Sequence, residues 1–180
     1  MPHIHTEPGQ HDHTVSAFIV RMDTPEPSIM LHVHKKVGLL LQFGGHIELN
    51  ENPWEAMSHE LTEETGYDPD QLSILQPRYP HITFLPNAVV HPVPLVQNTH
   101  NYEAGNENHK HVDTVYAFVA TSAPRQKPDE GESTDIRVFI LSELEVIPEG
   151  IIAENCRAVS IAILEYFLEN WERKPLTDFS

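Results

Sequence analysis

Short runs of hydrophobic and β-branched residues recur along the chain, and each run has the length of a strand. In chain order the runs occupy residues 14–22, 29–34, 37–43, 72–75, 112–121 and 136–141. A segment rich in turn-forming residues, 23–28, separates the first two runs, so we expect them to pair as a hairpin. The third run is expected to stop at Gly44-Gly45.

A helix is predicted over residues 53–65. Asn52 is a good N-cap, Pro53 fits the first helical position, and Glu55 completes a capping box with Asn52. Gly66 is the expected C-terminal stop. The apolar residues that share one side of this helix, and that we expect to face the core, are Trp54, Met57 and Leu61.

A second helix is predicted over residues 148–173, because apolar residues recur there at helical spacing. Its expected core face consists of Val159, Ala162, Ile163, Tyr166 and Phe167. Two segments with several polar residues and prolines, 77–108 and 122–133, are predicted to be loops. The first is long and irregular, and long ordered loops in compact domains are often functional.

These elements predict a single domain over residues 14–173. Residues 1–13 contain four histidines and two prolines, so we expect a tail or a first loop there. Residues 174–180 are expected to form a C-terminal tail. Because strands, a helix, more strands and a last helix follow one another, the sequence indicates an α/β fold with helices packed on a mixed sheet.

The net charge of the chain disfavours some classes of binding partner. Eleven Lys and Arg stand against 27 Asp and Glu, a formal net charge of -16. We therefore expect no general attraction to a nucleic-acid duplex or an anionic membrane, and an anionic substrate would need a metal ion or a few local cations. The single Cys156 cannot form an intrachain disulfide, and the N-terminus lacks a signal-like segment, so we expect a cytoplasmic protein.

Three acidic residues of the first helix carry the strongest chemical signal. Glu60, Glu63 and Glu64 occupy one face about 100° wide, beside the apolar face. Exposed pairs at these spacings repel by roughly 0.2–0.5 kcal/mol each, and the nearest candidate cation is His59. An acidic face that simply points at water is the ordinary interpretation. A divalent cation such as Mg²⁺ or Mn²⁺, shared with a phosphate-bearing substrate, would remove the repulsion.

The residues around this face resemble the Nudix box. Gly45 is followed after five residues by Glu51, and after seven more by His59-Glu60-Leu61-Thr62-Glu63-Glu64-Thr65-Gly66-Tyr67. Every diagnostic acid and glycine of the family pattern is in register. Two positions depart, since His59 replaces an Arg and Tyr67 replaces an aliphatic residue. The resemblance extends over residues 14–170.

The resemblance implies a Nudix-like α/β/α sandwich around a mixed sheet and the hydrolysis of a nucleoside diphosphate linked to another group. It implies Mg²⁺ or Mn²⁺ as cofactor. Glu60, Glu63 and Glu64 would be metal ligands and catalytic groups, with the Gly45 carbonyl completing the metal shell. Glu51 and His59 would orient the box, His59 more weakly than the usual Arg. An acid from a later loop, for which we select Glu132, could help to deprotonate the attacking water.

Histidines form a second candidate group. His109 and His111 lie two residues apart and should point to one side of a strand, near Asp113 and His100. Imidazoles with a carboxylate suit a transition metal. Ordinary polar packing is the alternative. The segment from Pro92 to Asp113 also resembles a poorly characterised bacterial Nudix subgroup, which supports shared structure rather than a particular reaction.

Several alternatives stay open at this point. His59 keeps open a Nudix-fold module that binds a nucleotide or a partner without turnover. A diphosphate isomerase is disfavoured, because it needs a placed cysteine and Cys156 lies far from the box in sequence. Nucleoside triphosphates, ADP-ribose-like sugars and dinucleoside polyphosphates all remain candidate substrates, and a homodimer is plausible. Candidates for stacking on a base are Phe43, Phe84 and Tyr102.

Overall fold

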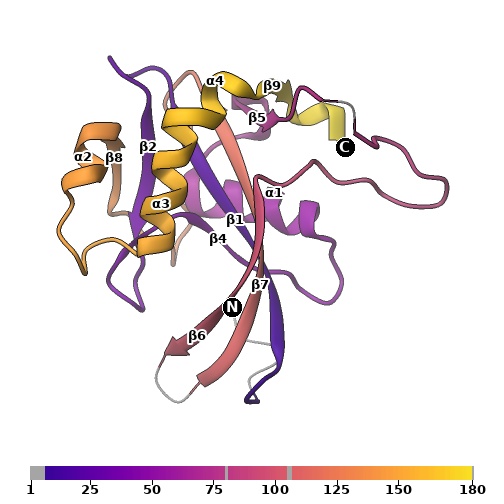
Figure 1. Ribbon diagram of the computed structural model, residues 1–180, viewed down its shortest axis with the longest axis horizontal. Helices are drawn as coiled ribbons and strands as arrows, with labels where there is room; N and C mark the ends of the chain where they lie inside the picture. Colours follow the sequence, from indigo (N-terminus) through magenta and orange to yellow (C-terminus); the bar gives the residue numbers. More distant parts are fainter. Residues whose placement is uncertain (1–6, 80, 105–106, 180) are drawn as a thin grey trace.

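The strands of this computed structural model, which describes residues 7–79, 81–104 and 107–179, form one mixed nine-stranded sheet (Figure 1). They are β1 (His11–Arg21), β2 (Ser28–Val33), β3 (Leu40–Leu41), β4 (Phe43–His46), β5 (Leu72–Gln76), β6 (Val96–Ala104), β7 (Glu107–Ala120), β8 (Ile136–Ile140) and β9 (Glu172–Pro175). The main order is β3-β2-β1-β7-β5-β9, with β4 paired to β1, β6 to β7 and β8 to β2.

The α-helices are α1 (Pro53–Thr65), α2 (Leu141–Val146), α3 (Glu154–Ala162) and α4 (Leu168–Asn170). A π-helical turn, Ile163–Phe167, joins the last two, and 3₁₀ turns occur at Pro69–Gln71 and Leu176–Phe179. No described helix has the length and apolar character needed to span a lipid bilayer.

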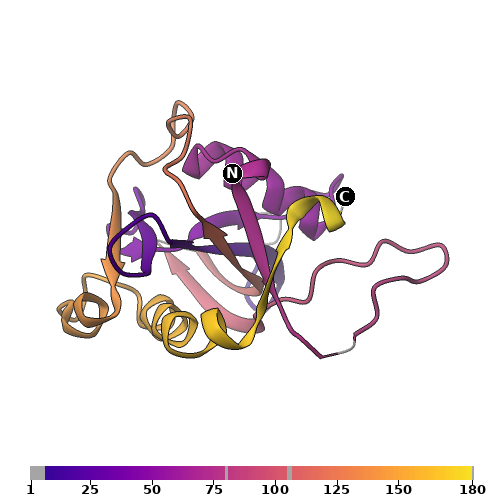
Figure 2. The same ribbon diagram turned by 90° about the horizontal axis from the view of Figure 1, so that it is seen from above.

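The helices cover both faces of the sheet, as Figure 2 shows with α1 on one side and α3 on the other. Successive residues of β1 point to opposite faces. Each face therefore has its own core. The core under α1 includes Val15, Phe43, Trp54, Leu61, Tyr67 and Phe118. The core under α2 and α3 includes Phe18, Leu31, Val115, Leu144, Cys156 and Ile163. The predicted α/β/α sandwich is confirmed.

The hairpin and the first helix are confirmed as well. β1 pairs antiparallel with β2. The Asn52 side chain accepts hydrogen bonds from the backbone N–H groups of Trp54 and Glu55, and Glu55 Oε2 accepts one from the Asn52 N–H at 2.8 Å. Gly66 ends the helix at φ 71°, a left-handed conformation that glycine adopts without strain. Trp54, Met57 and Leu61 are buried as expected.

Two strand predictions were wrong in extent. Gly44 and Gly45 do not stop a strand; they lie within β4 and pair with Ser16 and Val15 of β1. The segment 77–108, predicted to be a loop throughout, contains β6 and the start of β7. The buried positions at this end of β7 are histidines rather than aliphatic residues, so the hydrophobic pattern did not mark it as a strand.

The ends of the sheet also differ from the sequence prediction. β1 begins at His11, so residues 11–13 belong to the sheet rather than to a tail; residues 1–6 lie outside the described residues. The predicted helix over 148–173 begins only at Glu154 and ends at Asn170. After it, β9 pairs with β5 and Leu176 is buried, so the first residues of the predicted C-terminal tail belong to the fold. Tyr166, predicted to face the core, is 56% exposed.

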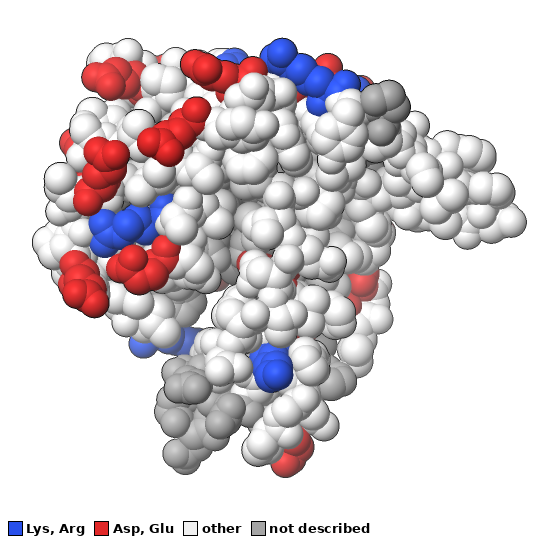
Figure 3. Space-filling model, viewed as in Figure 1, with Lys and Arg blue, Asp and Glu red and all other residues white. Residues whose placement is uncertain are grey.

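A long loop between β5 and β6 projects from the body of the molecule (Figures 1 and 2). Residues 79–95 contain no Asp, Glu, Lys or Arg, and the projection is white in Figure 3. Its exposed large hydrophobic side chains are Tyr79, Ile82, Phe84, Leu85 and Val89. An uncharged, apolar projection of this kind is typical of a surface that contacts another protein.

Candidate active site

A cleft of about 700 Å³ opens where β1 changes partners, from β4 at its start to β2 at its end. This volume lies in the usual range for small-molecule sites. The acidic face of α1 forms one wall and the β6–β7 arm another, with the β2–β3 turn and the loop before β8 at the mouth. Of the predicted site residues, the cleft is lined by Gly45, Glu60, Glu63, Glu64, His100, His111, Asp113 and Glu132.

The three carboxylates of α1 occupy different environments. Glu60 and Glu64 are buried, whereas Glu63 is exposed. Glu64 Oε2 accepts a hydrogen bond from the Gly44 backbone N–H at 2.7 Å. Burial, followed by the charge of Glu63, raises the pKa of Glu60 to about 7. Burial also raises the pKa of Glu64 to about 8, although the Gly44 hydrogen bond opposes the shift.

The site fits a divalent cation. Glu60 Oε1 is buried and has no hydrogen-bond partner among the described residues. A Cβ atom at Gly45 would lie 2.2 Å from that oxygen, so only glycine lets the strand approach the carboxylate so closely. Oxygen donors that are clustered, desolvated and short of cationic partners are the chemistry that Mg²⁺ or Mn²⁺ satisfies. The residues that would hold the ion are Glu60, Glu63, Glu64 and the Gly45 carbonyl.

The raised pKa values predict a pH-dependent stability. A carboxyl group whose pKa is higher in the folded than in the unfolded state binds extra protons when folded, so it stabilises at low pH and destabilises at high pH. We expect the metal-free protein to lose unfolding free energy as the pH rises from 4.5 to 8, because Glu60 and Glu64 then ionise in the folded state against their raised pKa values. Denaturant unfolding in the presence of a chelator measures this loss.

Other titratable groups also affect the unfolding free energy between pH 4.5 and pH 8. The wild-type protein is therefore compared with the Glu64→Gln variant. That variant should lose less unfolding free energy over the interval, and saturating Mg²⁺ should flatten the wild-type curve. Parallel curves for the two proteins would contradict the expectation.

Glu51 and His59 form the contact that the sequence suggested. His59 Nδ1 lies 2.9 Å from Glu51 Oε2, and the other oxygen of Glu51 accepts a hydrogen bond from the Glu48 N–H, also at 2.9 Å. The carboxylate therefore links α1 to the turn that follows β4. The His59 side chain is 65% exposed, so this link is a surface contact.

A His59→Arg substitution tests that link. Arginine stays charged at every pH and can donate two parallel hydrogen bonds, whereas a histidine generally loses its charge near neutral pH. We expect a gain of about 0.5 kcal/mol in unfolding free energy. Chemical denaturation of the two proteins checks it, and a destabilised variant would show that the imidazole is required for its shape.

Glu132 lies in a loop that the end of α1 holds in place. The Asp129 N–H donates to the Glu63 carbonyl at 2.8 Å, and Ser133 Oγ donates to the Val33 carbonyl at 2.8 Å on the other side. Glu132 lines the cleft, and its charge helps to raise the pKa values of Glu60 and Glu64. The structure thus places this loop acid in the same cleft as the helix carboxylates.

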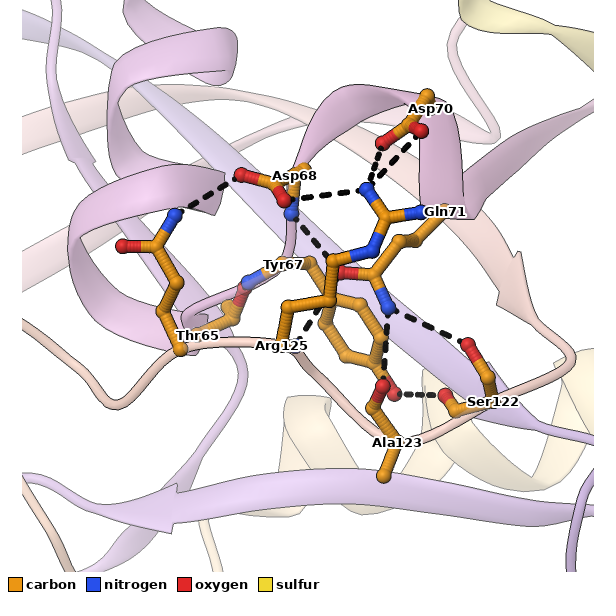
Figure 4. A network of polar contacts seen from close by, with 9 residues as sticks. Thr65, Tyr67, Asp68, Asp70, Gln71, Ser122, Ala123 and Arg125 are labelled. Carbon is orange, nitrogen blue, oxygen red and sulfur yellow. Dashed lines mark hydrogen bonds and ion pairs between the residues drawn. The ribbon is translucent and has the colours of Figure 1, made fainter.

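A polar network fixes the first part of the same loop (Figure 4). The Tyr67 hydroxyl donates to the Ser122 carbonyl at 2.9 Å, and Gln71 Nε2 donates to the Ala123 carbonyl at 2.9 Å. Arg125 pairs with Asp70 at 2.7 Å. Tyr67, the second departure from the box pattern, therefore uses its hydroxyl to tie the end of the box to the loop that carries Glu132.

The predicted histidine group assembles only in part. His109 and His111 point to one side of β7, with their Nε2 atoms 3.2 Å apart. Asp113 lies on the same side but accepts hydrogen bonds from Thr14 Oγ1 and Ser16 Oγ at about 2.9 Å. His100 Nδ1 contacts Asn98 Oδ1 at 3.0 Å, and its ring lies beside that of His111. The residues that join His109 and His111 are instead His46 and Asp12.

The three aromatic residues that were candidates for stacking on a base lie in different parts of the structure. Phe43 is fully buried and Phe84 lies in the projecting loop, whereas Tyr102 lines the cleft and stacks on His111. Cys156 is a residue of α3 that is buried in the core beneath this helix and does not line the cleft, and burial raises the pKa of its thiol to about 12.

Sequence reasoning missed two cations and one acid at this site. Lys35 and Lys36 line the cleft, and Lys35 donates to the Gly131 carbonyl. Adjacent lysines in so acidic a chain were a usable signal. Asp12 was assigned to the tail, and only the parallel pairing of β1 with β7 brings it to the histidines.

Comparison with known proteins finds similarity in both sequence and structure. The sequence model of the NUDIX domain matches residues 11–155. A hydrolase of the NUDIX family from Clostridium perfringens is similar at 29% identity and TM-score 0.65, over 86% of this chain and 96% of that chain. A search of curated protein sequences found no match.

Two further solved structures show the fold alone, because their identities are low. A NUDIX hydrolase from Nitrosomonas europaea has 20% identity and TM-score 0.56, over 95% of this chain and 97% of that chain. The NUDIX domain of Shewanella oneidensis NrtR, solved with ADP ribose, has 14% identity and TM-score 0.53, over 83% of both chains.

Proposed function

The chain belongs to the Nudix family and is a Nudix pyrophosphohydrolase, and we propose that it is a metal-dependent hydrolase of a nucleoside diphosphate linked to another group. The observation that carries the proposal is the packing of Glu60 and Glu64 against Gly44 and Gly45 inside the cleft. A purely structural helix gains nothing from buried carboxylates that repel one another, whereas a cation site requires them.

The reaction is the attack of water on one phosphorus of the pyrophosphate. A new P–O bond forms, the bridging P–O bond breaks, and the proton of the water goes to a carboxylate of the cleft. When bound, Mg²⁺ or Mn²⁺ neutralises the charge of the pyrophosphate and makes the water more acidic. Glu60, Glu63 and Glu64 supply the negative charge that would bind the ion. One of them or Glu132 accepts the proton of the water.

Other residues have positioning roles in this proposal. The Gly44 N–H fixes the Glu64 carboxylate, and the Glu51–His59 contact fixes the turn that leads into α1. Lys35 and Lys36 supply positive charge at the mouth of the cleft, where the phosphates of a substrate would enter. Tyr102 offers an aromatic face for a base or sugar on the β6–β7 wall.

Burial keeps a further cleft residue neutral. His32 is buried against Phe43, and burial lowers its pKa to about 4. A neutral imidazole can hydrogen-bond a polar group of the substrate without adding charge. We therefore propose that His32 and Tyr102, which both line the cleft, contact the nucleoside, whereas the α1 wall binds the pyrophosphate.

The test is a panel of nucleoside triphosphates, dinucleoside polyphosphates and nucleoside diphosphate sugars, including ADP-ribose, with Mg²⁺ or Mn²⁺. Phosphate or nucleotide release is measured beside a Glu63→Gln/Glu64→Gln variant. Turnover that needs the metal and is lost in the variant supports the proposal. Tight, metal-dependent binding without turnover across the panel would favour the second candidate, a binding module, for which the histidine at position 59 is the supporting observation.

We also propose a homodimer in the cytoplasm, with a small-molecule nucleotide as the other partner. The surface that we expect a second copy to cover is the uncharged loop between β5 and β6, where Phe84 is 77% exposed. Phe84→Asp should shift the mass in sedimentation velocity from dimer to monomer. Val146→Asp changes an equally exposed residue on α2 and should not. A monomeric wild-type chain would refute the proposal.

A further inference from the structure

A second group of metal-ligating side chains lies at the end of the cleft, apart from the carboxylates of α1. We propose that His46, His109 and His111, together with the carboxylate of Asp12, bind a transition-metal ion of the Zn²⁺ class. The ligand atoms of the three histidines all lie within 4.8 Å of one another. This site does not depend on the proposed hydrolysis.

The separations between donor atoms are those expected around one ion. Nε2 of His109 lies 3.2 Å from Nε2 of His111 and 3.6 Å from Oδ2 of Asp12. The same Asp12 oxygen lies 3.8 Å from Nε2 of His46. Donors bound to Zn²⁺ at about 2.0–2.2 Å in a tetrahedron are about 3.3–3.6 Å apart. The separation of 3.6 Å lies in that range, and those of 3.2 and 3.8 Å lie within about 0.2 Å of it.

Hydrogen bonding accounts for only one of these three contacts. The two Nε2 atoms of His109 and His111 can share a proton if one ring donates and the other accepts. At 3.6 and 3.8 Å, the Asp12 contacts exceed hydrogen-bond length. A single ion between the four groups would use all of them at once.

The fold brings the donors together from three strands and buries them. Asp12 of β1 is the parallel partner of His111 in β7, and His46 of β4 pairs with Thr14 two residues further along β1. Asp12 is 2% exposed and His109 is 1% exposed. The side chains that could bind a transition metal are therefore concentrated at one point of the sheet.

The donor chemistry separates the two sites. Three imidazoles and one carboxylate suit Zn²⁺ or a similar transition metal, whereas the all-oxygen set of α1 suits Mg²⁺ or Mn²⁺. With Asp12, which lies near His46 and His109, as a fourth ligand, the site would have the number of protein donors found in structural rather than catalytic zinc sites. The ion would fasten the start of β1 and the end of β4 to the arm formed by β6 and β7.

The experiment is a titration of the chelator-treated full chain with Zn²⁺, followed by competition with a chromogenic chelator, and a parallel titration with Co²⁺. We expect one tightly bound ion per chain, the intense visible absorption of tetrahedral Co²⁺, and a higher thermal midpoint with Zn²⁺. His109→Ala should weaken Zn²⁺ binding about 100-fold or more and abolish the Co²⁺ band. His46→Ala, at a less buried position, tests the same point if His109→Ala does not fold.

Two matched controls make the result specific. His11 and His13 flank Asp12 on the opposite face of β1 and are exposed, so His11→Ala/His13→Ala should retain the bound ion and the Co²⁺ band. Glu63→Gln/Glu64→Gln should also retain both, which separates this site from the proposed catalytic cation. Absence of a stoichiometric ion in the wild type, or an unchanged band in both His46→Ala and His109→Ala, would overturn the proposal.

Discussion

Glu64→Gln is expected to lower kcat by about 10³-fold while making the metal-free protein more stable at pH 8. The amide oxygen of glutamine can still accept the hydrogen bond from the Gly44 N–H, so the shape of the turn should survive. What disappears is a buried charge beside Glu60 and Glu132. Loss of activity with a gain in stability is the signature of a carboxylate kept for its charge.

The measurement pairs steady-state kinetics on the best substrate of the panel with denaturant unfolding in a chelator. Glu145→Gln removes a charge from an exposed position on α2 and should leave both quantities unchanged. Near-wild-type turnover of Glu64→Gln would remove Glu64 from the cation site. A destabilised variant at pH 8 would show instead that its carboxylate is stabilised by partners.

Gly44→Ala is expected to cost at least about 3 kcal/mol of unfolding free energy. The added Cβ would lie 2.1 Å from the carbonyl oxygen of Val15 and 3.0 Å from Cα of Ser16. Both atoms belong to the backbone of β1 at the centre of the sheet, so they cannot move aside as a side chain would. With φ at 134°, Gly44 also has a conformation that alanine rarely adopts.

Gly150→Ala is the matched control for this prediction. Gly150 has φ 78° and open space where the Cβ would lie, so the substitution should cost only about 1–2 kcal/mol. Chemical denaturation of the two variants separates the cost of the clash from the cost of the backbone conformation. Equal losses would mean that β4 can separate from β1 without penalty.

The parts predicted well from the sequence are those whose signals are local. The first helix has its N-cap at Asn52, its stop at Gly66 and its core residues at helical spacing, all within 15 residues. The three acids and Gly45 could be assigned from one continuous motif. Because these signals need no knowledge of distant pairing, the structure agrees with the predicted bounds and caps of the helix, and it brings the three acids and Gly45 to one cleft.

The parts predicted poorly depend on pairing across the chain. The last helix ends early because the backbone of Glu172 to Pro175 pairs with β5 as the edge strand β9, which a helical pattern of side chains does not reveal. The arm of β6 and β7 has histidines at its buried positions, so its period of two lacks the hydrophobic contrast that marks a strand. Asp12 was missed for the same reason, since only its register with His111 assigns it to a site.

The parallel pairing of β1 with β7 has a consequence for the order of folding. His11 pairs with Lys110 and Arg21 with Ala120, so each partner lies 99 residues further along the chain, by 110 − 11 and 120 − 21. Contacts of such long sequence separation are slow to form, because loop closure precedes any gain from the strand. On the ribosome, β1 can pair with β2 and β4 early, but its pairing with β7 must wait until residue 120 has emerged. During that interval α1 can form from local signals, but the cleft around its carboxylates cannot.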